Sequence, residues 1–345
     1  MPPTFARRGM TLVELLVVVS IMMIIMAVTL PRLRPELERG RTREAARSLH
    51  LYLTSARNRA VLEGRPCGVI IERMPTQGDA AMIVSQVEAP PPYCGDTLPQ
   101  MTAPYPGLAQ VQVQSGGPVN GIAFFLVTIS DLANNTAINI WPGDQIQFNY
   151  QGPWYNFIDP ANTGKPLATQ PFTVTLDVSQ GTTAPWPPTT ASPAYLPFKI
   201  MRRPIKAPAA PLQFPVPAVI DLTFSGVDTT ATPTANGINM WGSGTTPTLQ
   251  KPIIITFAPA GVVERLYFES NYFPVTQPIF LFVGKLDKVD QPSGSTNLDD
   301  ISNLWVAINP LTGLVSTTSM AAYGASNLSA SRANARQSAT VGGGH

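Results

Sequence analysis

An uninterrupted apolar segment near the N-terminus limits most strongly what this chain can fold into. From Met10 to Leu30 the sequence reads MTLVELLVVVSIMMIIMAVTL, in which Glu14 is the single charged residue. As an α-helix, the segment would be about 31 Å long, which is close to the thickness of the hydrocarbon core of a bilayer. A proline, Pro31, follows it directly. The segment therefore predicts a membrane-spanning helix.

Three ordinary explanations of this segment each leave something unexplained. A secretory signal peptide usually has an apolar stretch of about 7–15 residues before a small-residue cleavage site, and no such site follows Leu30. The pair Arg7-Arg8 suggests a twin-arginine signal, but its surroundings match poorly. A plain membrane anchor does not account for Glu14, because a carboxylate inside a spanning helix costs a few kcal/mol.

The string RGMTLVE, from Arg8 to Glu14, resembles the signal of type IV prepilins. The resemblance implies that a prepilin peptidase cleaves between Gly9 and Met10 and that the new amine of Met10 is methylated. Glu14 then occupies the fifth position, where the family has its assembly glutamate. Pro31 occupies the twenty-second position, where many pilins have a proline that distorts the helix.

The physical chemistry of the cleaved end agrees with this resemblance. The positive amine of Met10 on one subunit could neutralise Glu14 of a neighbour in a low-dielectric bundle, where an unpaired charge is unfavourable. The helix would serve first as a membrane anchor and later as the core of a filament. The simpler alternative for Glu14 alone is a position among the lipid headgroups.

A second helical stretch, amphipathic and expected over residues 31–65, follows the apolar one. Apolar residues recur at helical spacing along it, and Gly64-Arg65-Pro66 ends it with typical stop residues. The buried positions that this spacing predicts are Leu49, Leu53, Ala56 and Ala60. The helix and the glycine turn into the next strand resemble minor pseudopilins of the GspH/FimT type.

Beyond residue 66 the sequence consists of short alternating segments separated by turn residues. Alternation of polar and apolar residues, as in QIQFNY from Gln145 to Tyr150, is typical of strands with one buried face. We expect an α+β, pilin-like fold in which a long N-terminal helix, half transmembrane and half amphipathic, packs on an antiparallel β-sandwich. The expected divisions are a leader (1–9), a transmembrane and filament-core helix (10–30), an amphipathic helix (31–65), a β-rich domain with Pro-rich insertions (66–319) and a flexible tail (320–345).

Composition argues against catalysis and against a resident cofactor or metal. The chain has two histidines, 13% charged residues and a net charge of +2, and it has 36 prolines. Cys67 and Cys94 could form a disulfide after export or remain free thiols. Several aspartates near residues 287–300 could bind calcium, but lysines lie among them and a solvated loop is the better interpretation.

One basic cluster in the body, containing Arg202, Arg203 and Lys206, could contact phosphate or a partner, although a solvated edge strand explains it more simply. The expected function is that of a structural minor pseudopilin in a type II secretion pseudopilus, anchored in the bacterial inner membrane with its C-terminal domain in the periplasm. Its expected partners are the prepilin peptidase, other pseudopilins or pilins, and the membrane. Two alternatives remain: a minor type IV pilin that binds DNA through the basic cluster or through Arg332 and Arg336, and a membrane-anchored enzyme or binding protein.

Overall fold

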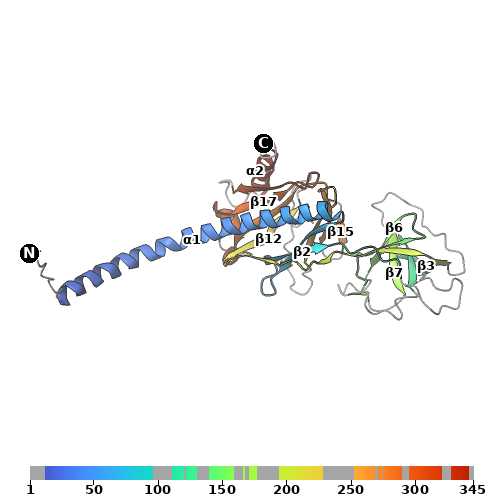
Figure 1. The fold of residues 1–345 in the computed structure, drawn as a ribbon, viewed down its shortest axis with the longest axis horizontal. Coiled ribbons are helices and arrows are strands. Elements are labelled where there is room, and N and C mark those ends of the chain that lie inside the picture. Colours follow the sequence, from blue (N-terminus) through green and yellow to red (C-terminus); the bar gives the residue numbers. More distant parts are fainter. Residues whose placement is uncertain are drawn as a thin grey trace, which may run out of the picture.

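The computed structural model consists of a long helix, a body built around one β-sheet and a second, smaller β-module (Figure 1). The helix α1 extends well beyond the body at its N-terminal end. The described residues are 12–95, 111–119, 122–129, 140–158, 166–167, 171–176, 194–227, 252–268, 271–273, 275–289, 295–320 and 328–341.

Helix α1 (Leu12–Glu63) is continuous from the apolar segment into the body. The expected division at Pro31 does not end it, since helical backbone runs through that proline. The helix ends at Gly64, which adopts a left-handed backbone (φ 64°) and donates its N–H to Ala60 O at 3.1 Å. A left-handed glycine is the usual way to end a helix, because it satisfies a carbonyl of the last turn at no steric cost.

The strands of the body, within the described residues, form an 11-stranded antiparallel sheet. Its main path is β15-β14-β13-β1-β2-β12-β16-β17-β18, and two short strands, β10 and β11, also pair with β2. In chain order the strands are β1 (Cys67–Arg73), β2 (Ala80–Glu88), β10 (Ile205–Lys206), β11 (Leu212–Gln213), β12 (Ala218–Val227), β13 (Ile253–Phe257), β14 (Val263–Phe268), β15 (Asn271–Phe273), β16 (Ile279–Lys285), β17 (Leu304–Ile308) and β18 (Val315–Ser319). Two 3₁₀ turns, η4 (Leu286–Lys288) and η5 (Asn297–Asp299), lie between β16 and β17.

The C-terminal half of α1 packs on one face of this sheet and forms the main core with it. The four residues predicted from helical spacing, Leu49, Leu53, Ala56 and Ala60, are all fully buried. They contact alternate residues of the strands, such as Ile255 on β13. The prediction of a helix packed on an antiparallel sheet is therefore confirmed.

The opposite face of the sheet is covered by a helix that the sequence did not suggest. We expected a flexible tail from residue 320, but α2 (Leu328–Val341) is helical and packs there. Its Ala335 is buried against the aromatic residues Phe280, Phe282 and Trp305. The prediction of a flexible tail was wrong because it rested on the absence of an apolar period in these residues. The contacts of α2 depend instead on small side chains and one arginine.

A second antiparallel sheet is formed entirely by the chain between β2 and β10. Seven strands make it within the described residues, in the order β8-β3-β4-β7-β6-β5-β9. They are β3 (Val111–Val119), β4 (Ile122–Ile129), β5 (Gln145–Phe148), β6 (Trp154–Ile158), β7 (Phe172–Leu176), β8 (Ala194–Leu196) and β9 (Phe198–Met201).

The two edges of this second sheet meet at Pro197. Leu196 pairs with Val111 at one edge, and Phe198 pairs with Phe148 at the other, so the sheet curls into a small barrel. Its interior is filled by side chains that include Phe148, Tyr155 and Phe157. We refer to β3–β9 as the barrel.

The sandwich that we expected from the alternating strands differs from this arrangement. A sandwich would bury the inner faces of two sheets in one shared core. Here the body sheet and the barrel have separate core clusters. Alternation shows that a strand has one buried face, but it does not show which other strands bury their side chains in the same core.

Candidate functional site

The N-terminal part of α1 presents apolar side chains outward rather than burying them. Leu12, Leu16 and Met23 are 80%, 59% and 66% exposed, and large apolar residues between Leu12 and Met26 are exposed like them. A contiguous exposed apolar surface of this kind is the mark of a site that contacts protein or membrane. The segment projects away from the body, which leaves it accessible on all sides (Figure 1).

Glu14 lies in the first turn of α1, exposed among these apolar residues. A carboxylate there is favoured by the positive end of the helix dipole. Gly9 and Met10, the predicted cleavage and methylation residues, lie outside the described residues. Among the described residues, no helix has an apolar stretch long enough to cross a membrane.

Comparison with known families shows that residues 5–30 match the prokaryotic N-terminal methylation motif. No curated protein and no solved structure matches the chain. The motif supports a prepilin-like protein, and it implies processing by a prepilin peptidase and assembly with other pilins. The matched region contains Gly9, Met10 and Glu14.

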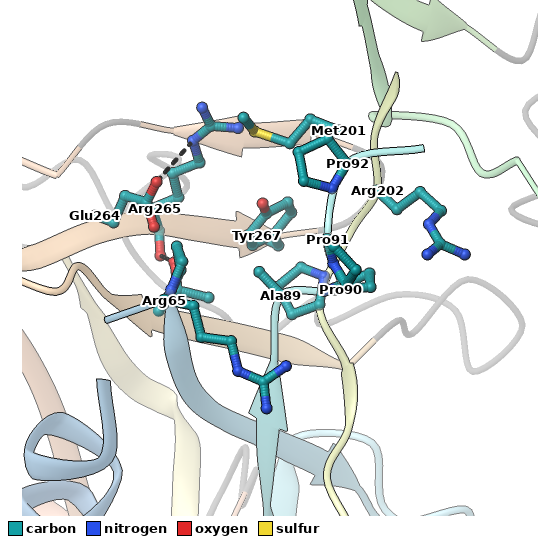
Figure 2. A pocket seen from close by; sticks show the side chains of 13 residues that line it. Arg65, Ala89, Pro90, Pro91, Pro92, Met201, Arg202, Glu264, Arg265 and Tyr267 are labelled. Carbon is teal, nitrogen blue, oxygen red and sulfur yellow. Dashed lines mark hydrogen bonds and ion pairs between the residues drawn. The ribbon is translucent and has the colours of Figure 1, made fainter. Parts of the chain in front are cut away.

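A cavity of about 400 Å³ lies where the barrel joins the body, and sequence reasoning did not predict it. Figure 2 shows Tyr267 between the proline run Pro90–Pro92 and the pair of Arg265 with Glu264. Arg265 also donates to Gln145 Oε1 of the barrel at 2.9 Å. Arg265 is thus engaged with both Glu264 and the barrel, and the prolines on the opposite side of Tyr267 restrict the backbone there. The cavity fits a role in setting the position of the barrel.

The basic cluster is largely engaged within the chain. Lys206 Nζ lies 2.8 Å from Glu72 Oε1, in an ion pair. The Arg203 guanidinium lies 5.0 Å from the centre of the Trp141 ring, and burial lowers its pKa. Arg202 lines the junction cavity. Arg203 therefore contacts the barrel, whereas Lys206 is paired within the body sheet.

Asp144 holds the same linker from the barrel side. Its carboxylate accepts the backbone N–H of Arg203 at 2.7 Å and that of Trp141 at 2.9 Å. Burial raises the pKa of Asp144 to about 6, against the opposing effect of these hydrogen bonds. The sequence does not indicate this role of Asp144, because the hydrogen bond from Arg203 forms only when the fold brings that distant segment beside it.

The two cysteines are free thiols in the structure, so the possible disulfide is not formed. Cys67 is buried at the start of β1, whereas Cys94 is exposed after β2. Burial is the main cause that raises the pKa of Cys67 to about 11, and Glu63, 3.7 Å from its Sγ, adds to the effect. A thiol with so high a pKa is a poor nucleophile at neutral pH.

The aspartates near residues 287–300 make internal contacts where they are described. Asp300 forms ion pairs with Lys285 and Lys288, each at 3.3 Å. Asp299 accepts the backbone N–H of Thr296 at 2.7 Å. In the described part of the chain, no group of three or more His, Cys, Asp or Glu residues is arranged to hold a metal ion.

Proposed function

We propose that this chain is a minor pseudopilin of the GspH/FimT type that supports protein export as part of a type II secretion pseudopilus. One observation carries the proposal: a single helix contains residues 12–30 of the methylation motif and exposes its apolar half, and its other half is buried against a sheet. Such a helix can be held by membrane or by neighbouring helices while the body remains folded.

The connection after the helix supports the subtype. The GspH/FimT resemblance includes a helix that leads through a glycine turn into the first strand. Here α1 ends at Glu63, Gly64 follows with a left-handed backbone, and β1 begins at Cys67, so the connection has that form. In this proposal the chain is held in the inner membrane by α1, exposes the body and barrel to the periplasm, and enters the filament after cleavage. Its role is structural, not catalytic.

The proposed cleavage is tested by mass spectrometry of the N-terminal peptide from a membrane fraction. We expect a peptide that begins at methylated Met10. An intact leader, or cleavage beyond Leu30, would overturn the prepilin assignment. In-cell crosslinking of the same fraction should join the chain to secretion pseudopilins; crosslinks to pili or DNA-uptake proteins would favour the DNA-binding role instead.

The assembly role of Glu14 is tested by the substitution Glu14→Ala. We expect normal cleavage but at least about tenfold less chain in isolated filaments, because the amine of a neighbour then lacks its counter-charge in an apolar bundle. Glu44→Ala is the matched control, since Glu44 is an exposed glutamate of the same helix beyond the apolar half. Equal incorporation of both variants would remove Glu14 from the assembly contact.

A further inference from the structure

Arg332 of α2 is buried in a cage of aromatic side chains on the body sheet. The rings of Phe280 and Trp305 lie beside its guanidinium; together with Phe282, which packs on Trp305, and Phe224, which packs on Phe282, they form what we call the cage. The guanidinium carbon of Arg332 lies 5.7 Å from the centre of the Phe280 ring and 6.0 Å from that of Trp305. Its Nη2 donates to the backbone carbonyl of Phe224 at 2.6 Å. Only 4% of the residue is exposed.

The cage is suited to a cation rather than to an apolar side chain. Aromatic faces attract guanidinium groups, and the attraction is stronger where water is excluded. Among the described residues no carboxylate forms an ion pair with Arg332, and its Nε has no hydrogen-bond partner. Burial without a counter-ion lowers its pKa to about 10. The rings and the Phe224 carbonyl are therefore the groups that stabilise this charge.

Other side chains of α2 also pack on the sheet. Trp305 Nε1 donates to Ser331 Oγ at 2.8 Å, Ala335 is buried, and Leu328 is partly buried. The Nε of Arg332 is buried without a hydrogen-bond partner, which makes the docking of α2 less favourable. Since α2 follows the last strand, it can leave the sheet without breaking any strand pairing.

We propose that the aromatic cage is a binding site for an arginine carried on a helix of small residues, and that α2 of one copy of this chain can occupy the cage of another. The resident α2 shows that this helix fits the site. The cage lies on the face of the sheet opposite α1, so an exchange of α2 leaves the packing of α1 intact. The proposal does not depend on the proposed function.

The test uses the full chain in detergent with the substitution Arg332→Ala, and a fluorescent peptide that corresponds to residues 328–341. We expect this variant to bind the peptide at least about tenfold more tightly than the unmodified chain, because its cage has lost its own arginine. Arg336→Ala is the matched control: Arg336 is exposed one turn further along α2, and this variant should behave like the unmodified chain. The same peptide with alanine at position 332 should not bind.

Two results would overturn the proposal. One is failure of the peptide to bind an Arg332→Ala chain that circular dichroism shows to be folded; the other is equal binding of both peptides. If Arg332→Ala does not fold, the variant Ser331→Ala replaces it. This substitution removes the hydrogen bond from Trp305 and so weakens the packing of α2 on the sheet, while it keeps the arginine. The peptide assay is then decisive with that variant.

Exchange between copies is tested by mixing Arg332→Ala chains with Trp305→Leu chains. The first variant retains the cage and the second retains the arginine, so we expect a mixed dimer by sedimentation that neither variant forms alone. If the Arg332→Ala chain binds the peptide as expected but no mixed dimer forms, the cage binds helices that carry an arginine, and the proposed exchange between copies is wrong.

Discussion

Asp221 of β12 shows how burial can reverse the usual pH response of a carboxylate. It accepts hydrogen bonds from Asn297 Nδ2 at 2.8 Å and from the Thr223 N–H at 3.0 Å, yet burial raises its pKa to about 6. A raised pKa in the folded state means that the folded chain holds this proton more tightly than the unfolded chain. The contribution of Asp221 to stability is therefore present at about pH 4 and is lost as the pH rises through about 6.

We expect Asp221→Asn to reduce this pH dependence. Between about pH 4 and pH 7 the unmodified chain should lose about 1–3 kcal/mol more unfolding free energy than the variant, since about two pKa units separate the folded and unfolded carboxyl. Urea unfolding at both pH values measures the difference. Parallel pH profiles for the two chains would contradict the assignment.

Gly313 is required by the turn between β17 and β18. Its φ of 63° is left-handed, and a Cβ there would collide with the backbone oxygen of Gly261. We expect Gly313→Ala to lower the unfolding free energy by about 1–3 kcal/mol through strain and crowding.

The control for this substitution is Gly40→Ala in α1. A Cβ at Gly40 has nothing within 4 Å, so the change should raise stability by about 0.5–1 kcal/mol through helix propensity. The midpoint temperatures of thermal unfolding should therefore shift in opposite directions for the two variants. A shift in the same direction would show that crowding at Gly313 does not cause the loss of stability.

At the scale of elements, α1 combines two helices of different character in one continuous rod. Residues up to Met26 expose their apolar side chains, whereas from Thr42 onward the helix buries one face on the sheet. Stability of the fold comes from the second half, because tertiary packing rather than intrinsic propensity holds most protein helices.

Because the second half of α1 buries only one of its faces, substitutions of two leucines only two positions apart should have unequal effects on stability. Leu53 is fully buried and Leu51 is 59% exposed. Leu53→Ala should lower the unfolding free energy by about 2–5 kcal/mol, since it removes a core side chain and leaves a cavity. Leu51→Ala should change it by less than about 0.5 kcal/mol. Chemical unfolding followed by circular dichroism would show whether the two differ in this way.

At the scale of the whole molecule, the body and the barrel have separate cores joined by two proline-bearing linkers. One linker contains Pro90–Pro92 and the other contains Pro204, and both border the junction cavity. Separate cores allow the two modules to unfold separately, since each buries its own apolar side chains.

We expect two unfolding transitions, which core substitutions should separate. Phe157→Ala in the barrel should weaken one transition by about 3–5 kcal/mol, and Phe257→Ala in the body should weaken the other by a similar amount. Hydrogen exchange read by peptide identifies the module that each transition reports. A single transition affected equally by both substitutions would show that the cores are coupled.

Local sequence patterns were sufficient for many of the elements. The alternating segment from Gln145 to Tyr150, for example, contains the strand β5 (Gln145–Phe148). The buried face of α1 was predicted from its helical spacing. The strand β6 (Trp154–Ile158) also alternates, between partly and fully buried side chains.

The sequence by itself determined the N-terminal signal, the helix that carries it and the presence of antiparallel strands, because each depends on residues close together in the chain. Tertiary structure alone decided that the strands form two cores, that α2 covers the body sheet and that Arg203 and Lys206 turn toward internal partners. These outcomes depend on contacts between distant segments. Arg332 and Phe224, 108 residues apart, have no common pattern until the fold brings them together.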